Sequence, residues 1–360
     1  MKKKGAASKA MMKAAAPAST MKAVKKFPAL KLANKLKFRQ LKVVRVPDLK
    51  GGALPKSLKE KYKDTKFKIR KSVTEDAKGS KHGDNYILKK MFADRPYESA
   101  HNRFQKDPNL PSKLKGVDLF ANRNVLDLGA NIGTFTVQAA VNGAKSVLAY
   151  EPDPETFRQL KLNIELNGKN SICSAVQAGA SADGKTASIY TKVRKNMLEN
   201  AGDLDYRPDR ANRNSLISDC VNPVATGEQV KTEKLGGIVR KFRPELVKCD
   251  IEGMELGIFD DLANKTESNK CGSDLSSVQE LMVYYHVDKW PKLRDFEQFL
   301  TNLKKLFPFV QPVWTSKIPD PEKKWDWRKE LKTNPELEGR SKEELGPAAK
   351  QMDILVYCAK

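Results

Sequence analysis

Residues 124–136 read NVLDLGANIGTFT and decide the fold of this 360-residue chain. Residues 125–128 are a short apolar run that suits a buried parallel strand, and the apolar spacing after Thr134 predicts a helix. Gly129 and Gly133 predict a tight turn between the two, because glycine lets backbone N–H groups approach a ligand that a Cβ atom would keep away. The stretch therefore predicts a strand, a ligand-binding turn and a helix whose N-terminus favours an anionic group.

The same pattern repeats in residues 146–168. Residues 146–150 predict a second strand, and Asp153-Pro154-Glu155 is typical of a helix N-terminus. Glu151 stands at the carboxyl end of this strand, where a carboxylate can accept hydrogen bonds from two ribose hydroxyls. Dinucleotide-binding enzymes and adenosylmethionine-binding enzymes both use an acid in this place, so another feature has to separate them.

The glycine turn separates those two ligand classes. A dinucleotide fingerprint G-x-G-x-x-G would require glycine where the sequence has Asn131 and Thr134. The D-x-G-x-N-x-G pattern instead suits a ligand with an amino-acid end, since backbone N–H groups face its carboxylate and an acid faces its ammonium. Small side chains near residue 178 would leave room for an adenine ring. The expected cofactor-binding residues are Asp127, Gly129, Asn131, Gly133, Glu151 and Ala178.

Two later segments place further polar residues at strand ends. Residues 246–249 predict a strand followed by Asp250 and Glu252, and residues 278–286 predict a strand that ends at His286. In an open α/β sheet, ligands gather outside the carboxyl ends of the strands. These side chains are therefore expected to converge with the acid at the end of the second strand.

Three segments resemble the class I S-adenosylmethionine-dependent methyltransferases of the FkbM family: residues 124–136, 149–164 (AYEPDPETFRQLKLNI) and 247–255 (VKCDIEGME). The resemblance covers about residues 120–290. It implies a Rossmann-like α/β fold with a seven-stranded, mostly parallel sheet, S-adenosylmethionine as cofactor, and O-methylation of a hydroxyl on a small molecule or sugar. Residues 310–314 and 353–358 are spaced like a terminal antiparallel pair, which favours the same sheet.

The reaction that the resemblance implies needs alignment of the reacting atoms and a group that takes the hydroxyl proton. Asp250 and His286 are the candidate catalytic residues. Asp250 could instead ligate Mg²⁺ together with Glu252 or Glu255, cap the next helix, or bind the cofactor's ammonium. For Glu255 we prefer a structural role, and for Lys248, which alternates with Asp250 along one strand face, an ion pair.

The positive charge is concentrated at the N-terminus. The chain has 67 Lys and Arg against 44 Asp and Glu, a net charge of +23, and residues 1–47 contain no acid. We expect residues 1–47 to be a disordered basic arm: a solvated tail, a targeting segment, or a tether that contacts polyanions without reading their sequence. Residues 48–95 are expected to be a linker or lid of irregular structure and short helices. Residues 96–360 are expected to form the methyltransferase domain, with a polar insertion at 191–229 over the site.

Composition excludes several other classes of protein. No apolar run reaches the roughly 18–20 residues of a membrane span, and the 5 cysteines lack the spacing of a disulfide framework or zinc ribbon. We expect an intracellular, cytoplasmic protein, although the basic arm leaves the nucleus or an organelle open. The alternatives are a nucleic-acid or protein methyltransferase guided by the arm, and a non-catalytic cofactor-binding or scaffold protein. The acceptor and the oligomeric state cannot be read from the sequence.

Overall fold

The computed structural model describes residues 41–49, 54–70, 84–192, 216, 223–267, 274–286, 293–314 and 353–360. All of them belong to the unit Phe38–Lys360. Residues 1–40, which make up most of the expected basic arm, lie outside the described part of the chain. So do residues 193–215 and 217–222 of the expected insertion.

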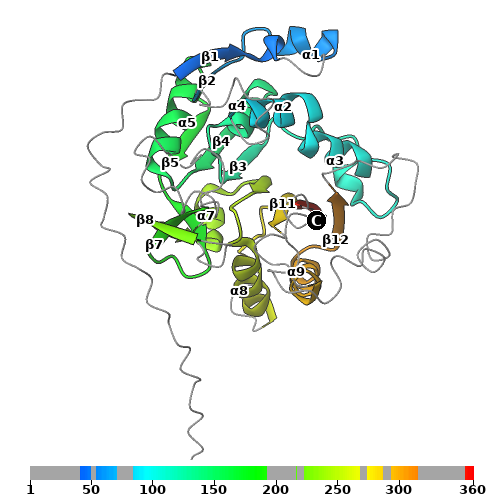
Figure 1. The fold of residues 1–360 in the computed structure, drawn as a ribbon. Coiled ribbons are helices and arrows are strands. Elements are labelled where there is room, and N and C mark those ends of the chain that lie inside the picture. Colours follow the sequence, from blue (N-terminus) through cyan, green and yellow to red (C-terminus); the bar gives the residue numbers. More distant parts are fainter. Residues whose placement is uncertain are drawn as a thin grey trace, which may run out of the picture. The chain divides into compact units, whose positions relative to one another are not determined.

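A seven-stranded sheet with the strand order β12-β13-β11-β10-β3-β4-β5 positions the site (Figure 1). Its strands are β3 (Asn124–Leu128), β4 (Ser146–Tyr150), β5 (Cys173–Val176), β10 (Leu246–Cys249), β11 (Glu280–His286), β12 (Phe309–Trp314) and β13 (Asp353–Ala359). Neighbouring strands are parallel, except that β13 runs antiparallel to both β11 and β12. The predicted sheet, mostly parallel with an antiparallel last strand, is confirmed.

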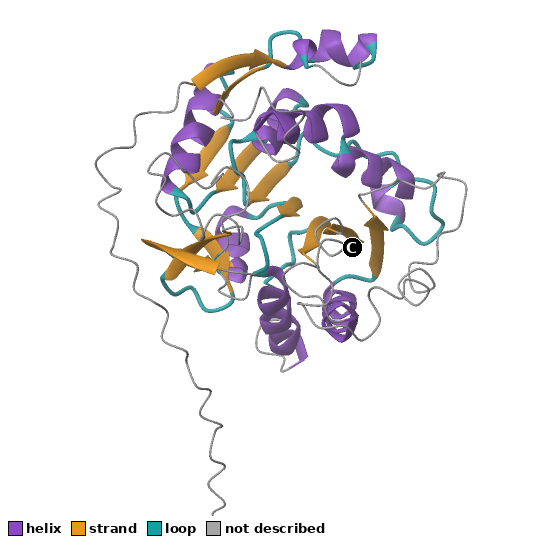
Figure 2. Cartoon of the chain, viewed as in Figure 1, coloured by secondary structure: helices purple, strands orange, loops and turns teal. Residues whose placement is uncertain are grey.

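Helices cover both faces of this sheet (Figure 2). They are α2 (Asp84–Lys89), α3 (Pro96–Phe104), α4 (Thr134–Val141), α5 (Pro154–Leu166), α7 (Leu235–Phe242), α8 (Glu255–Glu267) and α9 (Leu293–Leu306). Side chains from α2 to α5 share one apolar core, and those from α7 to α9 share the other. Successive strand residues alternate between the cores, so Tyr284 packs in the first and Tyr285 in the second.

The helix N-terminus predicted after β4 is present. Asp153 caps α5, because its side chain accepts a hydrogen bond from the Thr156 backbone N–H at 2.8 Å, and Pro154 occupies the first helical position. The capped helix packs its apolar stripe, including Leu160, into the first core. Its local sequence therefore fixes where the loop after β4 ends.

The N-terminal part of the described chain is more regular than expected. β1 (Leu41–Arg45) lies inside the range expected for the disordered arm, and it pairs antiparallel with β2 (Lys66–Arg70). The range expected to be a linker or lid also holds α1 (Lys56–Lys61), α2 and a π-helical turn, η3 (Lys90–Asp94). Ordered structure thus begins before residue 47, with β1.

The edge of β2 is held by side-chain amides of α5. Asn163 accepts a hydrogen bond from the Lys68 N–H at 2.7 Å and donates to the Lys68 carbonyl at 3.2 Å. Asn167 does the same with Lys66, at 2.9 and 2.7 Å. The two amides replace a neighbouring strand, because they satisfy backbone groups that would otherwise stay unpaired. This pairing explains why a lysine-rich segment forms an ordered strand.

The expected insertion begins and ends in strands. β7 (Ala187–Lys192) pairs antiparallel with β8 (Pro223–Val230), and β6 (Gly179–Ser181) pairs in parallel with β9 (Thr232–Lys234). Strand pairing thus extends into both ends of the expected insertion, at residues 191–192 and 223–229, where it satisfies backbone groups. Within the described ranges, no helix is both long and apolar enough to span a membrane.

Candidate active site

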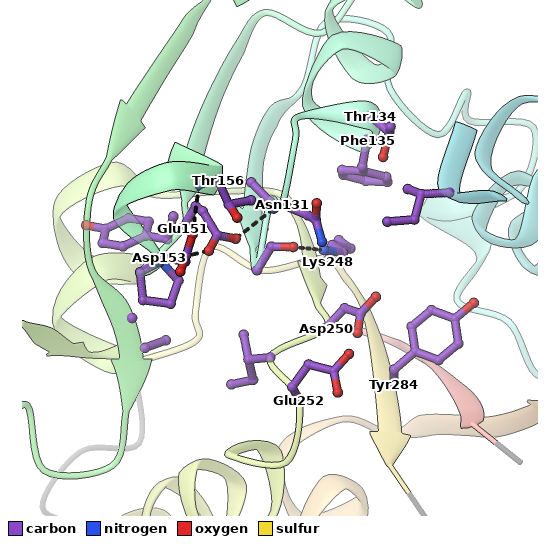
Figure 3. Close-up of a pocket in the computed structure, with 18 of the residues that line it drawn as sticks. Asn131, Thr134, Phe135, Glu151, Asp153, Thr156, Lys248, Asp250, Glu252 and Tyr284 are labelled. Carbon is purple, nitrogen blue, oxygen red and sulfur yellow. Dashed lines mark hydrogen bonds between the residues drawn. The ribbon is translucent and has the colours of Figure 1, made fainter. Parts of the chain in front are cut away.

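A cavity opens at the carboxyl ends of β3, β4, β10 and β11, where the sequence predicted convergence (Figure 3). Of the residues predicted for the site, Gly129, Asn131, Glu151, Ala178, Asp250, Glu252 and His286 line it. Figure 3 shows Glu151 on one side of the cavity and Asp250 with Glu252 on another. The two groups of acids therefore face one space although they are far apart in sequence.

The turn after β3 forms one wall of the cavity. Gly129 and Asn131 have positive φ angles of 73° and 52°. Asparagine tolerates that conformation better than most residues, and here its Oδ1 accepts a hydrogen bond from the Ile132 N–H at 2.7 Å. A Cβ atom on Gly129 would lie 1.8 Å from the backbone oxygen of Asp250. Only glycine at this position lets the loops after β3 and β10 meet.

Glu151 is fixed by backbone N–H groups from both sides. Its Oε2 accepts from Asn131 at 2.8 Å and its Oε1 accepts from Asp153 at 2.9 Å. Burial raises the pKa of Glu151 to about 7, against the lowering effect of these hydrogen bonds. Each carboxylate oxygen can accept two hydrogen bonds. Glu151 therefore keeps acceptor capacity for a ligand that donates two hydroxyl groups.

Asp127 and Gly133, which were predicted to bind the cofactor, do not line the cavity. Asp127 is fully buried beneath it: Oδ2 accepts from the Thr136 hydroxyl at 2.6 Å, and Oδ1 lies 3.1 Å from Lys248 Nζ. Gly133 caps α4 with a φ of 89°, and a Cβ atom there would lie 2.7 Å from Leu160 Cδ1. Both residues therefore support the turn from behind.

Lys248 forms the ion pair that its strand position predicted, but the partner is Asp127 on the adjacent strand. The two residues are register neighbours in the parallel pair of β3 and β10. Lys248 Nζ also donates to the carbonyls of Leu128 and Gly129, at 3.1 and 2.7 Å. The buried ammonium therefore holds the start of the glycine turn against β10.

Asp250, Glu252 and His286 form a second cluster in the cavity. His286 Nε2 lies 3.3 Å from Asp250 Oδ1 and 3.9 Å from Glu252 Oε1. His286 Nδ1 lies 3.0 Å from Glu255 Oε1 on the opposite side of the ring. The two oxygens of Glu255 also accept from the backbone N–H groups of Ile251 and Gly253, at 2.9 and 2.7 Å. Glu255 has the structural role preferred from the sequence.

The charges in this cluster stabilise one another. Burial alone would raise the pKa of Asp250, but the Lys248 ammonium and His286 outweigh it, and the pKa lies well below its usual range. Burial alone would lower the pKa of His286, but Glu255 and Glu252 outweigh it, and the pKa lies well above its usual range. Without a ligand, the cluster is an ionised carboxylate beside an imidazolium.

Sequence reasoning missed the wall opposite the sheet. It is built from α2, η3 and α3, and it contributes Tyr86, Ile87, Lys90, Met91 and Tyr97. Lys90 Nζ lies 4.7 Å from the ring centroid of Tyr284, a further lining residue, and Tyr97 packs edge-on against the same ring at 5.7 Å. The buried apolar residues of this segment follow helical spacing, so that periodicity could have indicated a packed helix.

A mostly parallel sheet with one reversed strand, and a cavity at its carboxyl edge, together define the class I methyltransferase fold. Residues 127–307 match the family described as the methyltransferase FkbM domain. The chain belongs to this family. Membership implies S-adenosylmethionine as the cofactor.

Two curated relatives share part of this domain. The chain is 26% identical over 141 residues to Methyltransferase 1 of Beauveria bassiana, which is 38% of this chain and 56% of the relative. It is 24% identical over 179 residues to the hexuronic acid methyltransferase AglP of Haloferax volcanii, which is 49% of this chain and 61% of the relative. The matched part thus spans less than two thirds of either relative.

Among solved structures, a StiE O-MT structure is 12% identical, with a TM-score of 0.36 over 76% of this chain and 77% of that chain. A METTL16 MTase domain is 10% identical, with a TM-score of 0.35 over 73% of this chain and 66% of that chain. Similarities this low carry no information about the reaction or the acceptor.

The cavity fits the cofactor of the family in two respects. The spare acceptor capacity of Glu151 suits a ribose with two adjacent hydroxyls. Ala178, Gly179 and Ala180 line the same cavity with small groups, which suits a flat ring system. A Cβ atom on Gly179 would lie 2.6 Å from Leu216 Cδ1, so Leu216 of the insertion packs closely against this wall.

Proposed function

We propose that the protein is an S-adenosylmethionine-dependent O-methyltransferase that acts on a hydroxyl of a small molecule or sugar. One observation carries the proposal: Glu151 and Asp250, the acids at the ends of β4 and β10, line the same cavity. Such an arrangement lets one side of the cavity hold a cofactor while the other side holds the group that attacks it.

The cofactor half of the cavity consists of Gly129, Asn131, Glu151 and Ala178. Glu151 accepts hydrogen bonds from the ribose hydroxyls, and the turn at Gly129 and Asn131 offers its backbone to the amino-acid end. Asp127 supports this half indirectly through Lys248, which holds the Gly129 carbonyl at 2.7 Å. The buried position of Glu151, which is 7% exposed, excludes water that would compete for these hydrogen bonds.

The acceptor half consists of the Asp250 cluster and the aromatic wall. When bound, S-adenosylmethionine supplies a methyl group on a sulfonium, and the C–S bond breaks as the O–C bond forms. Asp250 accepts a hydrogen bond from the attacking hydroxyl, orients it and receives its proton. His286 keeps the Asp250 carboxylate in place from 3.3 Å. These are the roles that we assign to the two predicted catalytic residues.

The aromatic wall supports a sugar or another ring-shaped acceptor. Tyr86, which is 44% exposed, lines this side of the cavity in front of the buried Tyr97 and Tyr284, and an aromatic face packs well against the apolar face of such a ring. The name of the archaeal relative, a hexuronic acid methyltransferase, is in keeping with a sugar acceptor. Contact of residues 1–47 with polyanions and a cytoplasmic location remain predictions.

A direct assay tests this function. The full chain is incubated with S-adenosylmethionine and a panel of hydroxylated sugars and phenols, and release of S-adenosylhomocysteine is measured. We expect turnover with at least one acceptor, and we expect Asp250→Asn to lower kcat by about 10²–10⁴-fold, the range for a general base. Release only with nucleic acid or protein acceptors would favour the alternative methyltransferases. Cofactor binding without any turnover would favour a scaffold.

The matched control for this assay is Glu165→Gln. It makes the same change from acid to amide on the exposed side of α5, away from the cavity. Its turnover should equal that of the wild type. A loss in this variant equal to the loss in Asp250→Asn would remove Asp250 from the proposed role.

A further inference from the structure

Three side chains of the kinds that ligate metals meet at the ends of β10 and β11. One ligand atom each from Asp250, Glu252 and His286 lies within 4.8 Å of the other two. The distances from His286 Nε2 to Asp250 Oδ1 and Glu252 Oε1 are 3.3 and 3.9 Å. Ligands at about 2.0–2.2 Å from a shared ion are roughly 3–4 Å apart, so the two distances from Nε2 match neighbours in one coordination sphere.

A fourth residue, outside this cluster, orients the imidazole. Glu255 is 1% exposed, and its carboxylate is held by the backbone N–H groups of Ile251 and Gly253. It faces His286 Nδ1 at 3.0 Å. The contact lacks hydrogen-bond geometry, but the adjacent carboxylate favours a proton on Nδ1 electrostatically, which leaves the lone pair on Nε2, as in metal-bound histidines. The lone pair of Nε2 then points toward Asp250 and Glu252.

Asp250 and Glu252 differ from a helix-capping acid. Glu255 is the acid buried against backbone N–H groups at the start of α8, whereas the side chains of Asp250 and Glu252 are 31% and 27% exposed and both line the cavity. Lys248, two residues before Asp250, directs its ammonium to Asp127 at 3.1 Å. The carboxylates therefore face the space into which a ligand enters.

We propose that Asp250, Glu252 and His286 bind a divalent first-row transition ion, with Glu255 as the positioning residue behind His286. One imidazole and two carboxylates form a mixed nitrogen and oxygen donor set. Mn²⁺, Fe²⁺ and Zn²⁺ accept such a set, whereas Mg²⁺ prefers oxygen ligands alone. The inference adds His286 to the two ligands expected from the sequence and replaces the Mg²⁺ expected with them.

The ion has a use in the proposed reaction. It would lie on the acceptor side of the cavity and make a bound acceptor hydroxyl more acidic, while Asp250 would hold the ion through one oxygen and receive the hydroxyl proton on the other. This use rests on the proposed function. Binding of the ion does not, because it depends only on the three ligands and Glu255.

Binding of Mn²⁺ tests the site without any assay of activity. The full chain is stripped with EDTA, exchanged into chelator-free buffer and titrated with MnCl₂, while electron paramagnetic resonance reports free Mn²⁺. We expect one Mn²⁺ per chain, displaced by equimolar Zn²⁺ but largely retained in a roughly tenfold excess of Mg²⁺, as the order of affinities for such a donor set predicts. No binding of Mn²⁺ or Zn²⁺ by a chain that binds S-adenosylmethionine overturns the proposal.

Variants then assign the ligands. Glu252→Gln should weaken Mn²⁺ binding at least about tenfold, and Glu255→Gln should weaken it about 10–100-fold through the imidazole. Glu165→Gln, on the exposed side of α5, should leave binding unchanged. If the His286→Gln variant, which changes a buried residue, does not fold, the Mn²⁺ affinity of Glu252→Gln decides the test. This variant must then still bind S-adenosylmethionine. Equal Mn²⁺ affinity in Glu252→Gln and the wild type overturns the proposal.

The two proposals fail in different ways. Mn²⁺ binding without methyl transfer to any acceptor supports the metal site and contradicts the proposed function. Methyl transfer that continues in EDTA, by a chain that binds neither Mn²⁺ nor Zn²⁺, supports the function and overturns the metal site.

Discussion

Lys248 Nζ lies 3.1 Å from Asp127 Oδ1, and the two residues are register neighbours on adjacent parallel strands. Their side chains are 6% and 0% exposed, so the pair is buried beneath the cavity. The same ammonium donates to the carbonyl of Gly129, the first residue of the glycine turn, at 2.7 Å. Fold stability and the shape of the cofactor half therefore depend on one buried pair.

Removing the charge of one member of this pair should lower the free energy of unfolding. Asp127→Asn leaves a buried ammonium without its counter-charge, and we expect the free energy of unfolding to fall by about 3–5 kcal/mol. Urea denaturation measures the change. The control is Lys185→Ala at the exposed pair of Lys185 and Asp183, whose side chains are 80% and 53% exposed; here the loss should stay below about 1 kcal/mol. Equal losses in the two variants would contradict the role of the buried pair.

Gly129→Ala should separate two loops that form the cavity. Its Cβ atom would lie 1.8 Å from the Asp250 backbone oxygen, at a φ of 73°. We expect loss of S-adenosylmethionine binding and a lower melting temperature. Gly116→Ala has a similar φ of 75° with nothing within 4 Å of the new Cβ, so it measures the conformational cost alone, about 1 kcal/mol. Similar effects of the two substitutions on cofactor binding would contradict the steric argument.

Cofactor binding should release a proton from Glu151. Burial raises its pKa to about 7 in the ligand-free protein, whereas ribose hydroxyls donate to the ionised form. Affinity for S-adenosylmethionine should therefore rise roughly tenfold between pH 6 and pH 8. Isothermal titration in buffers with different ionisation enthalpies counts the released protons. Release should vanish in Glu151→Gln; unchanged release in that variant would assign the proton to another group.

The same raised pKa predicts an opposite effect on stability. The folded state holds the proton of Glu151 up to about pH 7, whereas the unfolded chain loses it near pH 4.3. The contribution of Glu151 to folding stability therefore falls as the pH rises between these values. Glu151→Gln should raise the melting temperature at pH 8 by a few degrees while lowering cofactor affinity, as is common at active sites. A lower melting temperature at pH 8 would contradict this account of burial.

A second buried cluster sets a pH window for stability at the other end of the sheet. His101 Nδ1 lies 2.8 Å from Glu280 Oε1, and Arg123 and Tyr357 also donate to the Glu280 carboxylate. Burial opposes both charges, but the pairing prevails: the pKa of Glu280 is lowered and that of His101 is raised. Their joint contribution is therefore greatest between the unfolded pKa values, about 4.3 and 6.5.

The limits of this window follow from the two directions. The contribution of Glu280 is lost as the pH falls through its lowered folded pKa, and that of His101 is lost as the pH rises through its raised one. Urea unfolding of the wild type and His101→Gln at several pH values measures the difference. It should be largest near pH 6 and shrink at higher pH. A difference that does not change with pH would contradict the prediction.

The sequence predicted much of the lining of the cavity because local signals encode the elements that carry it. Short apolar runs, the glycine turn and the Asp153-Pro154 helix start fix each element independently of distant residues. Strand ends in a parallel sheet then meet by topology, which is how Glu151 and Asp250 come to line one cavity. Asp127 was expected to bind the cofactor, but it lies beneath the cavity. Period-two alternation indicates which face of the sheet its side chain is on, but not that it would pair with Lys248 there.

The aromatic wall of the acceptor half could not be predicted, because contacts between residues far apart in the chain hold it in place. Lysine-rich β2 pairs with β1 on one edge and with the amides of Asn163 on α5 and Asn167, its C-cap, on the other. Arg70, at the end of β2, then holds Asp84 at the start of α2 through a buried pair at 2.9 Å. These partners are far apart in the chain, so local secondary-structure propensity does not indicate the contacts between them.

Titration of the full chain with S-adenosylmethionine, in the wild type and in Glu151→Ala, tests the central claim most directly. The account predicts one site per wild-type chain and an affinity at least about tenfold lower in the variant, since removal of an ionised acceptor costs about 1.5–3 kcal/mol. Glu165→Ala should bind like the wild type. Equal affinity in Glu151→Ala and the wild type would contradict the account.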